Sequence, residues 1–238
     1  MTRTQKILIL LMIIIISIFS IYKISDKKIN YISIGDGLSL GIDSYGNEGF
    51  GYSDYIKDYL NSKDMLNIYT KKFSDKEMSI NRLINIIEID KKVDYNNTKI
   101  NLKRMLSDSK VITMSIGIND LIYKMSISNS LSIIKIEKIV NEIYNEFLYL
   151  IKVIRKYTKS NLYIIGYYSS DYFDYKFNYA IEKLNEKYKN TPGVIYIDTN
   201  YLIGNKYLLN PQSYYPNTQG YQVISSKIIE KITKKLEK

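Results

Sequence analysis

Short apolar runs rich in β-branched residues alternate along the chain with longer stretches in which apolar residues recur every three or four positions. The apolar runs predict buried strands at residues 29–34, 66–70, 110–116, 161–166 and 194–198. The periodic stretches predict helices at residues 52–60, 79–89, 133–156, 177–189 and 220–236. Residues 91–98 are polar, and we expect a surface excursion there. Strands that alternate with helices pair in parallel through crossovers, so we expect an α/β domain of three layers, α/β/α, with a mostly parallel sheet.

The most hydrophobic stretch lies near the N-terminus, where residues 7–22 carry no charge. As a helix that rises about 1.5 Å per residue, this run is about 24 Å long. If Lys23 extends its ammonium to the membrane surface, the span reaches residue 24 and approaches the lower limit for a transmembrane helix. Residues 17–25 lack two small residues two positions apart, the pattern at which a secretory signal peptide is cleaved. We therefore expect an uncleaved signal anchor with one N-terminal transmembrane helix rather than a buried core helix.

The 238 residues are enough for one α/β domain besides this anchor. We predict an anchor at residues 1–24, with the span at about 7–24, a linker at 25–28 and one domain at 29–238. Positively charged residues before the apolar run favour a cytoplasmic N-terminus, although lysines after the run reduce the difference in positive charge between its two ends. The expectation is therefore a single-pass protein of the cell membrane, held there by its N-terminal helix, with its C-terminal domain outside the cytoplasm.

The composition excludes several kinds of chemistry. The chain has no Cys, His or Trp, which rules out thiol nucleophiles, disulfides, Cys/His zinc sites and acid–base catalysis by imidazole. We expect no cofactor and no metal. The net charge is +10, but basic and acidic residues interleave along the predicted helices. This interleaving indicates a solvated, Lys-rich surface, and we expect no nucleic-acid partner.

Three short segments stand at strand ends or before the last helix: GDGLSLG at residues 35–41, GIND at 117–120 and PNTQGY at 216–221. Because the carboxyl ends of parallel strands meet at one edge of a sheet, we expect these segments to lie together. In the same order they resemble the sequence blocks G-D-S-L-[ST]-x-G, G-x-N-D and D-x-x-H-P-N-x-x-G-Y of the SGNH (GDSL-type) hydrolases. Residues 51–60 resemble a helix of membrane-anchored members from Gram-positive bacteria.

The resemblance implies a flavodoxin-like fold over residues 29–238 and a site built from a Ser nucleophile, a His base, an orienting Asp and an oxyanion hole. In this sequence Gly37 stands at the Ser position, Tyr215 at the His position and Gln212 at the Asp position. A looser match places Asp75 or a neighbour where the family has an oxyanion Gly. Only Asn119 remains of the catalytic set. We therefore expect a pseudoenzyme, a membrane-anchored binding or scaffold protein for an envelope glycan, acyl or protein partner.

Other interpretations remain open at this stage. The chain is alternatively an active esterase, acylhydrolase or deacetylase of envelope substrates with a non-standard site, for which Ser39 is a candidate nucleophile. Asp36 and Asp120 are more often caps of their own turns than bases or metal ligands. Asn119 either donates to a ligand or stabilises its loop. Tyr215 would project toward residue 37. The candidate binding residues are Asp36, Gly37, Ser39, Asn119 and Tyr215.

Overall fold

The computed structural model describes residues 5, 9–15, 28–128 and 130–236, and within them five strands form one parallel sheet. The sheet order is β2-β1-β5-β6-β7, which is the flavodoxin-like order once the strands outside this sheet are left out of the count. Its strands are β1 (Ile29–Gly35), β2 (Leu66–Thr70), β5 (Ser109–Ser115), β6 (Asn161–Ile165) and β7 (Ile195–Ile197). The five predicted strands and the α/β fold are confirmed.

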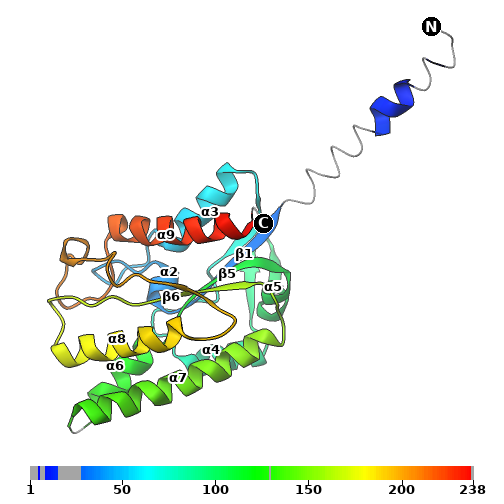
Figure 1. Cartoon of the computed structure of the whole chain (residues 1–238). Coiled ribbons are helices and arrows are strands. Elements are labelled where there is room, and N and C mark those ends of the chain that lie inside the picture. Colours follow the sequence, from blue (N-terminus) through cyan, green and yellow to red (C-terminus); the bar gives the residue numbers. More distant parts are fainter. Residues whose placement is uncertain (1–4, 6–8, 16–27, 129, 237–238) are drawn as a thin grey trace.

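Helices cover both faces of the sheet. Helix α9 packs on α3 on one face, and α7 packs between α4 and α8 on the other, as Figure 1 shows. The larger helices are α3 (Tyr52–Ser62), α4 (Ile80–Glu88), α7 (Ile133–Arg155), α8 (Tyr175–Lys189) and α9 (Thr218–Leu236). These helices form because apolar residues recur at helical spacing. In α7, for example, Ile136, Ile143, Phe147 and Ile154 are fully buried.

Five segments differ from the sequence-based expectation. Residues 91–98, expected as a polar excursion, belong mostly to an antiparallel hairpin of β3 (Lys92–Tyr95) and β4 (Thr98–Asn101). Three short helices were not predicted, namely α2 (Gly37–Leu40), α5 (Leu102–Asp108) and α6 (Ile118–Ser126). A 3-10 turn, η1 (Asn205–Tyr207), precedes the last loop. Helix α2 and the 3-10 turn have only four and three residues, too few for apolar residues to recur at helical spacing.

Most of the expected membrane anchor lies outside the described residues. Within it, residues 9–15 are helical and their side chains are exposed. In the part of the chain that the structure describes, we find no helix that is both long enough and apolar enough to span a bilayer. The expected linker at residues 25–28 is described only at Lys28.

Candidate functional site

The candidate site lies at the carboxyl ends of β1 and β5, where the chain order of the sheet reverses direction. From β1 the chain moves to β2 on one side and then to β5 on the other. Ligands of doubly wound sheets bind at such a switch point. The segments 35–41, 74–79, 117–120 and 210–217 meet here, as the hydrogen bonds between them show. The sequence therefore predicted correctly that its three motif segments share one edge.

Gly35 allows β1 to end directly against β5. Its φ is +125°, and a Cβ on this residue would lie 2.9 Å from the carbonyl carbon of Ser115. A side chain at this position would meet both backbone strain and a clash with the neighbouring strand. The turn that follows brings Asp36 into the switch point.

Asp36 is a fully buried turn cap. Its carboxylate accepts hydrogen bonds from the Leu38 amide at 3.0 Å, from the Ser115 hydroxyl at 2.6 Å and from the Tyr167 hydroxyl. Burial raises the pKa of Asp36 to about 6, against the opposing effect of these hydrogen bonds. The Leu38 contact caps α2, which confirms the interpretation of Asp36 as a cap.

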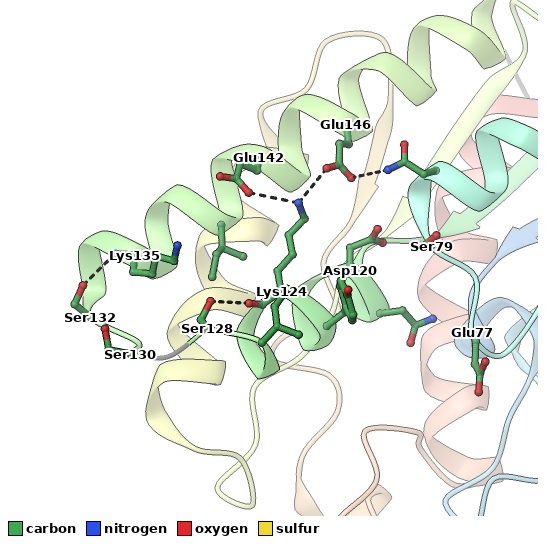
Figure 2. A pocket seen from close by; sticks show the side chains of 15 residues that line it. Glu77, Ser79, Asp120, Lys124, Ser128, Ser130, Ser132, Lys135, Glu142 and Glu146 are labelled. Atoms are coloured by element: carbon green, nitrogen blue, oxygen red, sulfur yellow. Dashed lines mark hydrogen bonds and ion pairs between the residues drawn. The ribbon is translucent and has the colours of Figure 1, made fainter.

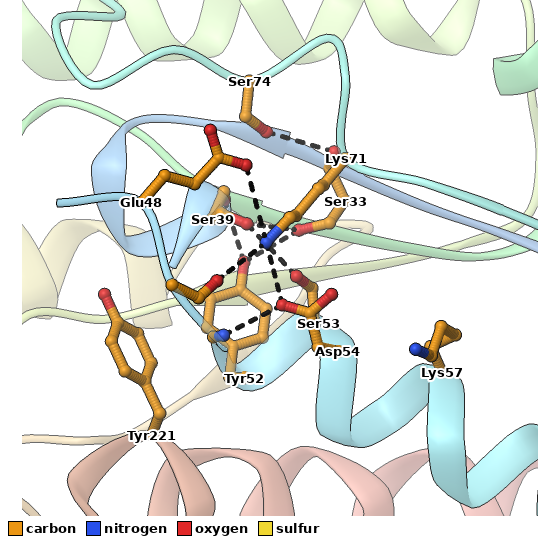
Figure 3. Close-up of polar contacts among 12 residues, drawn as sticks. Ser33, Ser39, Glu48, Tyr52, Ser53, Asp54, Lys57, Lys71, Ser74 and Tyr221 are labelled. Atoms are coloured by element: carbon orange, nitrogen blue, oxygen red, sulfur yellow. Dashed lines mark hydrogen bonds and ion pairs between the residues drawn. The ribbon is translucent and has the colours of Figure 1, made fainter. Parts of the chain in front are cut away.

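The Ser39 hydroxyl is engaged within the core. It donates to the Ile34 carbonyl at 2.7 Å and accepts from the Ser115 amide at 3.1 Å. Its Oγ also lies 2.8 Å from the Tyr52 hydroxyl and 2.7 Å from Ser115 Oγ. Figure 3 shows the Tyr52 hydroxyl directed at Ser39. Ser39 has no exposed surface, so a substrate carbonyl has no path to it in this conformation.

The ring of Tyr215 occupies the space beside Gly37. A Cβ on Gly37 would lie 2.5 Å from Cζ of Tyr215 and 2.7 Å from its Cε1, closer than two carbon atoms approach without a bond. Tyr215 is only 4% exposed, and its hydroxyl contacts the Tyr214 hydroxyl at 3.0 Å and donates to the Lys76 carbonyl at 3.4 Å. Burial raises the pKa of Tyr215, so the phenol stays neutral at physiological pH.

Asn119 uses both amide protons within the protein. Its Nδ2 donates to the carbonyls of Lys76 and Met78, each at 3.0 Å, and its Oδ1 accepts from the Tyr214 hydroxyl at 3.1 Å. The side chain therefore connects the start of α6 with two loops, which favours the loop-stabilising alternative over donation to a ligand. The backbone amide of Asp75, at the expected oxyanion position, donates to the Gly35 carbonyl at 3.0 Å.

Asp120 contacts a second element that the sequence did not indicate. Its carboxylate accepts from the backbone amide of Ile80, at 3.1 and 3.3 Å, where α4 begins, and also from its own backbone amide. The helix starts of α4 and α6 are brought together by folding, which the local sequence does not reveal. Burial raises the pKa of Asp120 to about 6.

Gln212 stays at the surface and does not join this buried group. Its backbone amide donates to Asn210 Oδ1 at 3.0 Å, and its side chain borders a cavity of about 320 Å³ over Tyr214 and Tyr215. In the described chain, no group of three or more Asp and Glu side chains is placed to hold a metal ion.

Sequence reasoning missed several residues that build the site. Ser115 and Lys76 carried no signal, because one is an ordinary strand residue and the other contributes only a carbonyl. Tyr167, Tyr168 and Tyr214 stand in pairs of adjacent tyrosines, and the sequence alone does not show which of them are buried. Tyr167 and Tyr168 are each 3% exposed. These two side chains, like Tyr215, pack into the protein.

Comparison of the fold with solved structures identifies similar architectures. A lipase from a goat rumen metagenome superposes with a TM-score of 0.68 and 16% identity over 85% of this chain and 97% of the other. A member of the lipolytic G-D-S-L family from Veillonella parvula has a TM-score of 0.58 and 18% identity over 86% and 98%. The chain has the SGNH fold.

An acetylxylan esterase from Geobacillus stearothermophilus, solved as a catalytic mutant, shares the SGNH fold with a TM-score of 0.61 and 13% identity over 86% of this chain and 94% of that one. At these identities the likeness extends to the fold alone. No family model matches the sequence, and no curated protein matches it.

Proposed function

We propose that this chain is a non-catalytic protein with the SGNH fold, anchored to the cell membrane by its N-terminal apolar segment. Its domain lies outside the cytoplasm and binds or scaffolds an envelope glycan, acyl or protein partner. Two observations support the proposal. Lipases and esterases have the same fold, and at the switch point of this chain the groups needed for hydrolysis are either absent or hydrogen-bonded to other protein groups.

The contact between Tyr215 and Gly37 carries the proposal. A hydrolase of this kind needs an exposed nucleophile next to a base. Here residue 37 has no side chain, and the ring of Tyr215 takes the space that one would need. A tyrosine with a raised pKa is a poor general base at neutral pH.

The donors of an oxyanion hole are also engaged. The Asn119 amide and the Asp75 backbone N–H both donate to carbonyl oxygens of the protein. A developing oxyanion is stabilised only by donors that are already free and aimed at it. Loss of the nucleophile and base together typically lowers turnover by about a millionfold.

The membrane part of the proposal rests on the sequence. Residues 7–22 carry no charge, and the domain that follows begins within a few residues of the apolar run. A short linker of this kind would hold the domain close to the bilayer surface. Membrane attachment is tested by fractionation of cells that produce the full-length chain and a variant lacking residues 1–24. The full chain is expected in the membrane fraction.

Ester hydrolysis tests the absence of catalysis. We would assay the full-length chain against a panel of short-chain acyl esters, beside the Ser39→Ala variant and a triple variant carrying Gly37→Ser, Gln212→Asp and Tyr215→His. The triple variant restores the family's residue types and removes the ring that blocks residue 37. The proposal predicts no turnover above buffer for the natural chain and for Ser39→Ala.

Two other outcomes of the hydrolysis assay would change this account. Steady turnover by the natural chain would overturn the proposal, and its loss in Ser39→Ala would identify an unexpected nucleophile. Turnover by the triple variant alone would show that the scaffold retains a usable crevice once Tyr215 is replaced.

A further inference from the structure

A long polar groove lies beside the filled centre, on the far side of Asn119. It has a volume of about 1010 Å³ and runs between the start of α4, helix α6 and the first half of α7. Figure 2 shows its labelled side chains spread between Glu77 at one end and Ser130 and Ser132 at the other. An elongated cavity of this size suits a chain-like ligand better than a compact one.

Both hydrogen-bond donors and hydrogen-bond acceptors line the groove. The Lys124 ammonium lies 3.1 Å from a Glu146 oxygen and 3.4 Å from a Glu142 oxygen. The Asn81 amide donates to the other Glu146 oxygen at 3.5 Å. Serine hydroxyls line the end near the α7 start. Paired acceptors and donors of this kind match the hydroxyl groups of a sugar, each of which both donates and accepts.

The balance of charge in the groove differs from that of the whole chain. Four carboxylates line it, those of Glu77, Asp120, Glu142 and Glu146, against two ammonium groups, while the chain carries a net charge of +10. Within the described residues, the Glu77 carboxylate has no hydrogen bond or ion pair. An acidic ligand such as a polyphosphate or a polyuronate would be repelled here.

Tyr123 adds an aromatic surface at the edge. It lines the groove and is 64% exposed, and neighbouring Ile127 is 61% exposed. An aromatic face next to hydroxyl, amide and carboxylate groups packs against the apolar C–H face of a sugar ring while the polar groups take its hydroxyls. We infer that this groove binds a linear oligosaccharide without acidic groups.

The inference rests on the proposed function, since it names the partner class and the place where that partner binds. Binding here involves neither Gly37 nor Tyr215, so its test is separate from the hydrolysis assay. Ester turnover together with the expected sugar binding would overturn only the proposal that the chain is non-catalytic. If neither ester turnover nor sugar binding is found, only the inference about the groove is overturned.

Isothermal titration of the full-length chain with four tetramers tests it: N-acetylglucosamine, glucosamine, galacturonic acid and lysine. The neutral and the amine-bearing sugar tetramers are expected to bind saturably, and the galacturonic acid tetramer is expected not to bind. Tyr123→Ala should weaken sugar binding about fivefold through loss of the stacking surface. Tyr201→Ala is the matched control, because Tyr201 is 91% exposed and lies outside the groove.

Each remaining outcome contradicts the inference. Binding of the lysine tetramer as tightly as the sugars would identify a site for cationic peptides. Preference for the galacturonic acid tetramer would contradict the argument from charge. Equal weakening by Tyr123→Ala and Tyr201→Ala, or no saturable binding by either expected sugar, would exclude the groove as a sugar site.

Discussion

The ring of Tyr215 lies in contact with Gly37, so that a Cβ added to Gly37 would stand 2.5 Å from Cζ of the tyrosine. One residue follows the first strand and the other precedes the last helix, and folding places them at the same switch point. The lack of a side chain at residue 37 and the presence of a large one at residue 215 are therefore coupled. A side chain at residue 37 therefore clashes with Tyr215 in its present position.

This coupling predicts a non-additive double-mutant cycle. Gly37→Ala should lower the free energy of unfolding by about 1–3 kcal/mol, because the new methyl group overlaps the Tyr215 ring. In a Tyr215→Ala background the same change should cost less than about 0.5 kcal/mol, since the ring is gone. Urea unfolding of the four proteins measures both costs. Equal costs in the two backgrounds would show that Tyr215 does not occupy the space at residue 37.

Ser39 is predicted to contribute to stability and not to chemistry. Ser39→Ala removes the acceptor of the Ser115 amide and the donor to the Ile34 carbonyl, both buried. We expect a loss of about 1–3 kcal/mol in the free energy of unfolding. Ser226→Ala, at an exposed position of α9, is the control and should change it by less than about 0.5 kcal/mol. Unchanged stability of Ser39→Ala would contradict the hydrogen-bond network described for this side chain.

The buried carboxyl of Asp36 predicts a specific pH dependence. Its pKa is about 6 in the folded chain against an ordinary value of 3.8, so the folded state binds more protons between these values. The contribution of Asp36 to the free energy of unfolding is therefore highest below pH 3.8 and falls as the pH rises to about 6. A pKa raised from 3.8 to about 6 lowers the free energy of unfolding by about 3 kcal/mol once the pH exceeds both values.

The Asp36→Asn variant isolates this contribution because it keeps the shape of the side chain without its charge. The stability of the variant relative to the natural chain should increase as the pH rises from 4 to about 6.5, by up to about 3 kcal/mol. Urea unfolding at several pH values measures this difference, and the raised pKa of Asp120 affects both proteins alike. A difference that stays constant with pH would contradict a raised pKa for Asp36.

Much of the fold could be predicted because the central strands are continuous apolar runs. Residues 29–34 and 110–116 are almost entirely buried, as their β-branched composition predicts. The hairpin of β3 and β4 was missed because its polar residues outnumber its apolar ones. Asn96 and Asn97 both have positive φ at its turn, and this Asn pair between alternating residues was a usable signal.

The site could be predicted only in outline. The position of the three motif segments follows from strand polarity, and the sequence predicted that Tyr215 points toward residue 37. The engagement of Asn119 could not be predicted, because its partners, Lys76, Met78 and Tyr214, lie on two other loops. The contact of Asp120 with the Ile80 amide could not be predicted for the same reason, since it exists only after α4 and α6 pack together.

The most direct test of the central claim is covalent labelling with a fluorophosphonate, which reacts with activated serine hydroxyls. The full-length natural chain and the triple variant carrying Gly37→Ser, Gln212→Asp and Tyr215→His would be treated alike and analysed by intact mass and peptide mapping. The account predicts no adduct on the natural chain, because no serine of the switch point is both exposed and paired with a base. Labelling of any serine in the natural chain would contradict the account, provided that the same serine is not labelled when the protein is heat-denatured before the reagent is added.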